Sequence, residues 1–398
     1  MPVIASVRTG GLAKFLGELG YDVTVITAEH AGEYAGKCRV VRAKSPTTIN
    51  FPERRGLAKH LEKRLRRVFG RAVKSVIHYP DDKKGWIPYA YEAASRLLEK
   101  ERFDVMITSG GPSSVYLIGW KIKRTYGLPW IADMRDAWTQ NPVYPYLSAR
   151  KFFEKRLELG ILKDADAITA TSMILAEKIG GFHRRRVHTI PNGFDPEILS
   201  TRAPPRNEKL TFVYTGNVWG GYQYDLSLFF GPLRELMDEG AVDPGSVSVD
   251  FFGEVRGGGK DSARKYGLDD IIRMNESVER DVAIGKQRSA DVLLQFSWTD
   301  GNDRGFIPGK IFEYLAARRP ILAVGGFCDD AVTELIGQTN AGVCAYDKDG
   351  VKKALKRSYD EFRDRGTVEY HGIQAEIDRY SQVEMAAKFA KIMEKIGR

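Results

Sequence analysis

The feature that most constrains the fold is an alternation of short β-branched runs with helical patterns, which occurs twice along the 398 residues. Such repeated strand–helix units form parallel sheets that helices cover on both faces. The sequence therefore predicts an α/β chain with two Rossmann-like parallel-sheet domains. In the first half, the expected strands are 23–27, 39–41, 105–109, 130–133, 167–171 and 187–190, and the expected helices are 10–19, 57–76, 90–100, 113–126 and 149–162. In the second half, the expected strands are 211–215, 247–252, 292–296, 321–324 and 343–346, and the expected helices are 225–239, 280–289, 309–317, 331–336, 350–362 and 383–396.

One stretch, 194–207, interrupts this rhythm with three prolines and little periodicity. Because prolines without an apolar period are typical of connecting segments, we interpret this stretch as a linker. The expected organisation is a first domain at 1–193, the linker, a second domain at 208–380 and a final helix within 381–398.

The two halves differ in charge. Residues 1–200 carry 33 basic and 21 acidic side chains, a net of +12, whereas residues 201–398 carry a net of −3. Much of the excess lies in 54–74, where nine basic residues accompany one acidic residue and five apolar residues recur at helical spacing. A basic amphipathic helix of this kind can bind an anionic membrane surface. The alternative is a solvated helix whose apolar stripe packs on its own domain. A nucleic-acid partner is not expected, because no binding motif accompanies the patch.

Composition excludes several other classes. The sequence has no apolar run of the roughly 18–20 residues that a membrane-spanning helix needs, and its first residues do not resemble a secretory signal. The three cysteines are scattered, which suits a reducing cytosol and matches no zinc spacing. The acidic pairs at 81–82 and within 300–303 are expected in solvated loops, so the sequence predicts no metal site.

Polar residues and glycines follow several expected strands directly. Arg135-Asp136 follows 130–133, Gly216-Asn217 follows 211–215, and Gly253 follows 247–252. Ligands of open α/β sheets bind outside the carboxyl ends of the strands. Two facing domains would direct these residues into one cleft, although each glycine alone is also ordinary turn chemistry.

The most informative local signal is the stretch 304–317. Pro308 is placed to open a helix near its first position, and N–H groups of a first helical turn can hold a phosphate oxygen. Lys310 adds a positive charge beside them, and Glu313, one turn deeper, can accept hydrogen bonds from a ribose diol. One short element could therefore bind a diphosphate and its ribose. The alternative is a plain surface ion pair between Lys310 and Glu313, which contributes only tenths of a kcal/mol.

These motifs resemble glycosyltransferase family 4, whose members are retaining enzymes of the GT-B fold. Gly305-x2-Pro308-x-Lys310-x2-Glu313 resembles the donor-nucleotide motif, and 187–195, Val-His-Thr-Ile-Pro-Asn-Gly-Phe-Asp, resembles the signature that closes the first domain. Gly10-Gly11 with the following helix is similar to the opening loop. Residues 133–138 look like the variant seen in polysaccharide and O-antigen transferases.

The resemblance implies a function and an architecture. The chain would move a sugar from a nucleotide-diphosphate donor to a glycan or lipid-linked acceptor in cell-surface polysaccharide synthesis. Two Rossmann-like domains would face a cleft, and the last helix would cross back to the first domain. The protein would work in the cytoplasm, at the inner face of the membrane. A sugar nucleotide would be the co-substrate, with no cofactor and no metal.

Four departures from the family pattern matter. Gly305 stands where the family has the first glutamate of its Glu-x7-Glu pair, and no histidine lies near 109–112. The usual cations after the first strand of the second domain are replaced by Asn217 and its neighbours, which leaves Arg304 and Lys310 as candidate phosphate ligands. The family also has a strand before its glycine loop, whereas this sequence begins inside that loop, so two alternatives stay open: the true start lies upstream of Met1, or the first strand is absent.

The resemblance and the strand-end positions together define the candidate site. The expected catalytic residues are Asp136, Lys310 and Glu313, and because the leaving phosphate can take the acceptor proton in retaining transfer, no separate base is required. The expected substrate-binding residues also include Gly10, Gly11, Arg135, Gly216, Asn217, Gly253, Arg304, Gly305 and Phe306. Two alternatives stay open: another GT-B enzyme such as a sugar-nucleotide 2-epimerase, or a non-catalytic member that binds a glycan or a sugar nucleotide.

Overall fold

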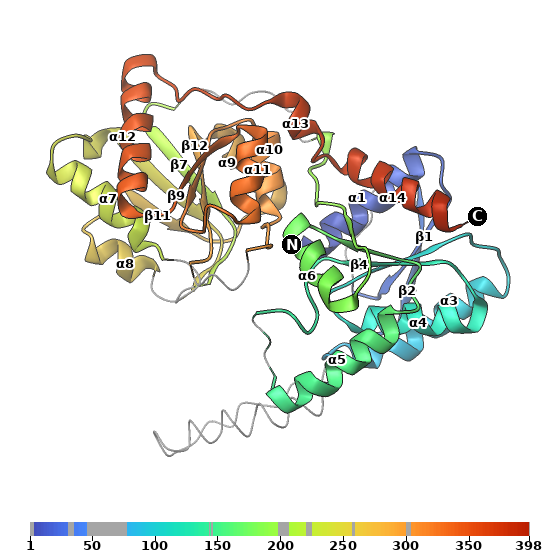
Figure 1. Ribbon diagram of the computed structural model, residues 1–398. Helices are drawn as coiled ribbons and strands as arrows, with labels where there is room; N and C mark the ends of the chain where they lie inside the picture. The colour runs from blue at the N-terminus through green and yellow to red at the C-terminus, as the bar shows by residue number, and fades with distance from the viewer. Residues whose placement is uncertain are drawn as a thin grey trace. The chain divides into compact units, whose positions relative to one another are not determined.

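The computed structural model describes residues 4–30, 36–45, 78–142, 144, 146–197, 207–219, 225–256, 259–299 and 304–397 (Figure 1). These residues form two compact units. We call residues 2–191 with 386–398 the N-terminal unit, and residues 192–385 the C-terminal unit. The chain therefore passes between the units twice. None of the helices in the described ranges is both long and apolar enough to cross a membrane.

The N-terminal unit is built on parallel strands. A four-stranded sheet has the order β3-β4-β5-β6, and β1 pairs with β2 in a separate two-stranded sheet. All five residues of β4 are buried, as expected for a strand that helices cover on both faces. The elements are α1 (Ile4–Glu18), β1 (Val23–Ala28), β2 (Cys38–Ala43), η1 (Lys84–Trp86), α3 (Ile87–Leu98), β3 (Met106–Ser109), α4 (Ser114–Tyr126), β4 (Trp130–Met134), α5 (Ser148–Leu162), β5 (Ala167–Ala170), α6 (Met173–His183) and β6 (His188–Thr189).

The last helix, α14 (Gln382–Ile396), begins in the C-terminal unit and continues into the N-terminal unit. Its Phe389 is fully buried, and the guanidinium carbon of Arg8 lies 5.5 Å from the centre of the Phe389 ring. Further along, burial and the nearby Glu394 carboxylate raise the pKa of Tyr21. The expectation that the last helix returns to the first domain is confirmed.

The C-terminal unit contains a six-stranded parallel sheet of order β11-β9-β7-β12-β13-β14. This is the Rossmann order, in which the direction of winding reverses between β7 and β12. The core combines aliphatic side chains with a cluster of aromatic rings that contact one another. The elements are β7 (Leu210–Thr215), β8 (Val218–Trp219), α7 (Ser227–Asp238), η3 (Pro244–Ser246), β9 (Val247–Phe252), β10 (Val255–Arg256), α8 (Gly259–Lys265), β11 (Ile272–Asn275), α9 (Arg280–Ser289), β12 (Val292–Phe296), α10 (Lys310–Ala317), β13 (Ile321–Val324), α11 (Ala331–Thr339), β14 (Gly342–Ala345), α12 (Lys348–Arg365) and α13 (Gln374–Asp378).

The α/β class and the two parallel-sheet units confirm the fold expected from the sequence, and several details differ. The sequence pattern missed α6, α8, β11 and α13. The first helix begins at Ile4, so Gly10 and Gly11 lie inside α1 and not in a loop. The segment 54–74 lies outside the described residues, and the basic amphipathic helix expected there stays a prediction.

The start of the expected linker is a close backbone contact. Phe194 is 2% exposed and forms a parallel bridge with Ser381, which immediately precedes α14. A Cβ added at Gly193 would come within 2.6 Å of the Ser381 backbone. Glycine is therefore required at position 193 because two backbone segments touch there. The later part of the expected linker, 198–206, lies outside the described residues.

Candidate functional site

Lys310 begins α10 at the carboxyl edge of the six-stranded sheet. Gly309 is the N-cap, so Pro308 lies one position before the cap and not at the first helical position, as the sequence had suggested. The backbone N–H groups of Ile311 and Phe312 donate to the carbonyls of Pro308 and Gly309. Because these two first-turn donors are already used, the Lys310 amino group is the stronger candidate for holding an anion.

The surroundings of Lys310 withhold water from its charge. The Nζ atom lies 3.6 Å from the centre of the Tyr214 ring, and a Cβ added at Gly216 would lie 3.2 Å from the same atom. Burial holds the pKa of Lys310 well below its usual range, although the nearby Glu313 carboxylate favours the charged form. The face of the Tyr214 ring attracts the Lys310 ammonium group only weakly. A dianionic ligand at this position would therefore supply the counter-charge that Lys310 lacks.

Glu313 lies one turn further along α10 and is held by α9. Its Oε1 accepts a hydrogen bond from Arg280 Nε at 3.1 Å, and its Oε2 accepts one from Gln287 Nε2, also at 3.1 Å. Gln287 is 1% exposed and donates a further hydrogen bond to Thr215 at 2.9 Å. The ion pair of Glu313 is therefore with Arg280, and the alternative of a plain Lys310–Glu313 surface pair does not describe the structure.

Arg280 and Gln287 were missed by the sequence analysis. They lie seven residues apart on α9, two helical turns, which places them on one face. A polar glutamine on the same buried face as Ile284 was the signal that could have identified them.

Gly216 and Gly253 end β7 and β9, and their backbones touch. Gly216 has a φ of 120° and Gly253 a φ of 144°, and a Cβ at Gly253 would lie 2.3 Å from the Gly216 carbonyl oxygen. The side-chain oxygen of Asn217 accepts a hydrogen bond from the Glu254 N–H at 3.0 Å. These residues therefore fix the shape of the loops beside Lys310, and direct contact with a substrate stays a prediction.

Arg304, Gly305 and Phe306 lie beside an aromatic pocket at the ends of β12 and β13. The Arg304 guanidinium pairs with Asp329 and lies 4.6 Å from the Phe327 ring, so this candidate phosphate ligand is already engaged. Gly305 is buried. The pocket is lined by Phe296, Ser297, Trp298, Phe306, Pro308, Phe327, Asp330 and Val332.

Two features give this pocket its chemistry. The rings of Trp298 and Phe306 are 5.9 Å apart. The only carboxylate in the lining is that of Asp330, which accepts backbone hydrogen bonds from Phe327 and Thr333 and caps α11. The wall is therefore apolar and aromatic, and its acid is already satisfied.

Asp136 follows β4 in the N-terminal unit. Its side chain is exposed at the surface, and the protein atoms around it raise the pKa of the carboxyl group by partial desolvation, although Arg135 opposes this effect. Within the described residues, no hydrogen bond or ion pair reaches the Asp136 carboxylate. The alternative that Asp136 is a helix cap or one half of an ion pair therefore finds no support in this part of the chain.

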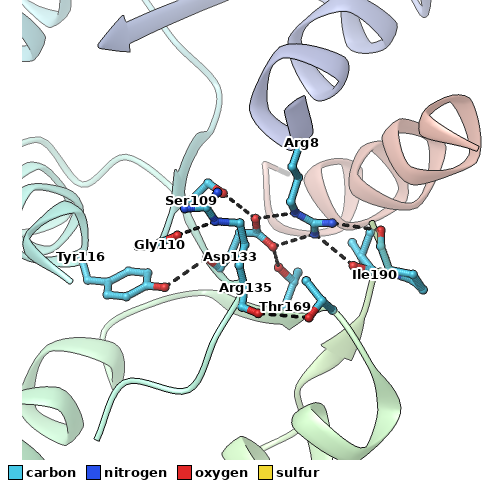
Figure 2. A network of polar contacts seen from close by, with 10 residues as sticks. Arg8, Ser109, Gly110, Tyr116, Asp133, Arg135, Thr169 and Ile190 are labelled. Carbon is cyan, nitrogen blue, oxygen red and sulfur yellow. Dashed lines mark hydrogen bonds and ion pairs between the residues drawn. The ribbon is translucent and has the colours of Figure 1, made fainter. Parts of the chain in front are cut away.

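Arg135 has a clear structural role. Its Nε donates to the carbonyl of Gly110 (Figure 2). Its Nη2 donates to the carbonyl of Gly111 at 3.1 Å. Gly111 has a φ of 86°. Arg135 thus holds the loop that follows β3, and its predicted contact with substrate is not tested by this geometry.

A buried network that the sequence analysis missed ties this edge of the N-terminal sheet together (Figure 2). Arg8 forms a two-pronged pair with Asp133 at 2.9 and 2.8 Å and donates to the carbonyls of Ile190 and Pro191. The Asp133 carboxylate also accepts hydrogen bonds from two hydroxyls, each at 2.7 Å, which belong to Ser109 and Thr169. The network thus connects α1 with the carboxyl ends of the four strands β3 to β6.

The charge balance of this network depends on Arg8. Burial alone would raise the pKa of Asp133, but the charge of Arg8 and the hydrogen bonds from Arg8, Thr169 and Ser109 outweigh it and lower the pKa. Asp133 is therefore a buried carboxylate that stays ionised.

The described part of the chain contains no group of three or more His, Cys, Asp or Glu side chains that could hold a metal ion. The acidic residues 300–303 lie outside it. Asp81, expected in a solvated loop, accepts the Ser114 N–H at 2.6 Å and the Lys83 N–H at 2.8 Å. Its carboxylate therefore holds the start of α4. That the protein needs no metal stays a prediction.

The architecture defines the class of protein. Two Rossmann-like parallel-sheet units, joined by a last helix that returns to the first, form the GT-B fold of glycosyltransferases. Residues 5–198 match the model of Glycosyltransferase Family 4.

Solved structures with this fold cover nearly the whole chain. Sucrose-phosphate synthase from Thermosynechococcus elongatus matches with a TM-score of 0.59 and 14% identity over 96% of this chain and 91% of its own. WaaG, a glycosyltransferase involved in lipopolysaccharide biosynthesis, matches with a TM-score of 0.51 and 11% identity over 99% and 95%. WaaB, a lipopolysaccharide outer core galactosyltransferase, matches with a TM-score of 0.58 and 14% identity over 98% and 96%. No curated protein sequence matches the chain.

Proposed function

We propose that this protein transfers a sugar from a nucleotide-diphosphate donor to a glycan or lipid-linked acceptor, with retention of the anomeric configuration and without a metal. The acceptor belongs to cell-surface polysaccharide synthesis. The observation that carries the proposal is the half-buried Lys310 amino group at the carboxyl edge of the sheet, beside Gly216 and one turn from Glu313.

The proposed reaction requires the protein to stabilise the negative charge that develops on the leaving phosphate. The bond between the anomeric carbon and the phosphate oxygen breaks through an oxocarbenium-like transition state. The acceptor oxygen bonds to that carbon, and its proton passes to the leaving phosphate. Negative charge grows on the phosphate as the bond breaks, so Lys310, placed beforehand where water is scarce, stabilises the transition state more than the bound donor.

Glu313 orients the nucleotide. Its carboxylate accepts hydrogen bonds from the ribose diol, while Arg280 and Gln287 fix the direction of its oxygens. Because both protein partners hold the side chain in place before the nucleotide arrives, little ordering is needed on binding.

The donor sugar lies against the Trp298–Phe306 pocket. Gly305 provides no carboxylate for sugar hydroxyls, and the two aromatic rings offer apolar surface for the carbon face of the sugar. Asp136, with a raised pKa and no partner among the described residues, is the carboxyl group that serves the sugar or the acceptor.

Two single substitutions test the donor site. Glu313→Ala should weaken nucleotide-diphosphate binding by about 1–3 kcal/mol, the cost of lost charge-assisted hydrogen bonds. Lys310→Ala should lower turnover more than affinity, because the phosphate charge grows in the transition state. Lys348→Ala, at an exposed lysine that begins α12, is the matched control. Unchanged kinetics in both site variants would remove α10 from the donor site.

The identity of the reaction is tested separately. Sugar-nucleotide hydrolysis is measured over UDP, GDP and ADP sugars, with the product anomer followed by NMR and with chelator added in a parallel series. Slow hydrolysis with retention, unaffected by chelator, supports the proposal. A 2-epimerised product indicates an epimerase, and binding without turnover indicates a non-catalytic member.

Work at the inner face of the membrane completes the proposal. Segment 54–74, which the structure does not describe, supplies positive charge near a lipid-linked acceptor. Changing Arg64, Arg66, Arg67 and Arg71 together to Gln should reduce sedimentation with anionic vesicles and leave donor binding intact. If the wild type ignores such vesicles at low salt, this part of the proposal fails.

A further inference from the structure

Helix α5 directs its acids inward. Glu154 and Glu158 are 1% and 0% exposed. Glu154 accepts hydrogen bonds from Arg150 Nε at 2.9 Å and from Trp138 Nε1 at 2.7 Å. Glu158 accepts the backbone N–H of Thr139 at 3.1 Å. Both negative charges of the helix are therefore satisfied within the N-terminal unit.

The opposite face of α5 carries large apolar side chains. Phe152 is 52% exposed and Phe153 is 61% exposed, and Leu159, nearly two turns after Phe152, is 37% exposed. Globular proteins usually bury phenylalanine and expose glutamate, so this helix reverses the usual pattern. Adjacent exposed phenylalanines in a helix whose acids are buried indicate a surface that contacts something else.

The exposed charges of α5 are all positive. Lys155 and Arg156 are exposed on the helix and Lys163 is exposed at its C-cap, and the outward positions of the helix include no acid. The Arg156 guanidinium lies 4.1 Å from the centre of the Phe152 ring. The two aspartates that follow the helix do not offset this charge, because Asp164 accepts from Trp120 and Asp166 pairs with Lys123.

We propose that this outer face of α5, made of Phe152, Phe153, Lys155, Arg156, Leu159 and Lys163, docks on an anionic lipid surface. Exposed rings that insert at the headgroup boundary and cations that meet lipid phosphates are the two components of such binding. A face with apolar and positive groups but no exposed acid matches this surface in charge. The inference rests on the proposed function, in which the protein acts at the inner face of the membrane. It assigns lipid contact to residues of α5, which the structure describes, and not to segment 54–74.

Vesicle sedimentation of the full chain tests the proposal. Wild type should bind vesicles of phosphatidylglycerol and phosphatidylcholine, bind pure phosphatidylcholine weakly, and lose binding as salt increases. Phe152→Ser with Phe153→Ser should weaken binding about tenfold. Changing Lys155, Arg156 and Lys163 together to Gln should weaken it by about fivefold per charge.

Matched controls separate this face from general effects. Tyr89→Ser removes an exposed aromatic ring of the same unit, and changing Lys348, Lys353 and Arg357 to Gln removes three exposed charges from the C-terminal unit. Neither control should change vesicle binding by more than about twofold. Binding of UDP or GDP, measured by calorimetry on the same variants, should stay at the wild-type value.

The outcomes are distinct. Wild type that does not sediment, or α5 variants that sediment like wild type, would overturn the proposal. Concentration-dependent dimerisation that only the Phe152/Phe153 variant loses would assign the face to a second copy of the chain and would also overturn it. Failure of nucleotide binding in the wild type would contradict the proposed reaction and leave the lipid result standing.

Discussion

The N-terminal unit buries ion pairs, whereas the C-terminal unit buries aromatic rings. Among the described residues, every paired acid and base with both side chains at or below 5% exposure lies in the N-terminal unit. The ion pairs are Arg8–Asp133 and Arg150–Glu154, and the third contact is a hydrogen bond of 3.2 Å between His183 Nε2 and Glu158 Oε1. In the C-terminal unit the acid Asp250 pairs with an Arg273 side chain that is 61% exposed, and the core includes a cluster of stacked and edge-on aromatic rings among aliphatic side chains.

The difference shows two ways to hold a parallel sheet and the elements around it in place. Buried charges cost desolvation energy. What they contribute is a fixed arrangement of the elements they join, because each hydrogen bond has a preferred direction. The Asp133 carboxylate accepts hydrogen bonds from side chains of α1, β3 and β5. These bonds hold the end of β4 in place and so position the residues that follow it, Arg135 and Asp136. Aromatic rings, in contrast, stabilise the sheet by burying apolar area and by packing against one another, and this stabilisation does not depend on pH.

The largest expected effect comes from breaking the buried pair. Asp133→Asn leaves the Arg8 charge buried without a counter-charge and should destabilise the N-terminal unit by about 3–5 kcal/mol. The same change at Asp250 should cost below about 1 kcal/mol, because Arg273 can turn to solvent. Hydrogen exchange in denaturant, read unit by unit, measures both. Equal losses in the two variants would mean that the units do not differ in this way.

Acid should act on the same pair. A carboxylate whose folded pKa is lowered contributes stability that is present above its unfolded pKa, near 3.9, and is lost as pH falls through the folded value. Asp81 and Asp136 have raised pKa values and work in the opposite sense. The stability difference between wild type and Asp133→Asn isolates Asp133, and it should shrink below about pH 4. A constant difference from pH 7 to pH 3 would contradict the assignment.

A smaller effect is expected in the aromatic core. Phe251 is fully buried, and its ring stacks on that of Phe296 at 6.0 Å. Phe251→Leu keeps an apolar side chain but removes the ring contacts, so it should cost about 1–2 kcal/mol in the C-terminal unit. Urea unfolding at pH 4 and pH 7 should give the same loss, since no charge is involved. A loss that changes with pH would show that the core depends on nearby titrating groups.

The smallest expected effect is the same in both units. Gly160 in α5 and Gly337 in α11 are helical, and an added Cβ would meet nothing within 4 Å. Changing either to Ala should stabilise its own unit by about 0.5–1 kcal/mol through helix propensity alone. Thermal unfolding would check this. A gain in one unit only would reveal a local difference that the contacts do not show.

Local signals in the sequence were enough to propose Lys310 and Glu313 as candidate site residues. A proline, a lysine and a glutamate at the start of one helix are close in the chain, so their spacing can be interpreted without the fold. Arg8 and Asp133 are 125 residues apart, and no periodicity connects them. Gln287 was missed for a different reason: a period-based search expects apolar residues at buried positions.

The boundaries of helices and strands were likewise predicted where a local sequence pattern defines the element and missed where distant contacts define it. The α9 prediction, 280–289, agrees with the structure, because an amphipathic pattern defines that helix. The strand β11 escaped detection because Arg273 and Asn275 interrupt its four residues, and only pairing with β9 makes it a strand. Gly10 and Gly11 suggested a loop, but the helix that contains them continues back to Ile4.

The double passage of the chain between the units has a consequence for synthesis on the ribosome. The C-terminal unit is one continuous stretch, 192–385, whereas the N-terminal unit needs residues 386–398 to cover Arg8 and Tyr21. The half that is translated first is therefore the half that is completed last. Until α14 emerges, the nascent N-terminal unit lacks the Phe389 ring beside its buried arginine. A chaperone that protects this chain would be needed longest at its beginning.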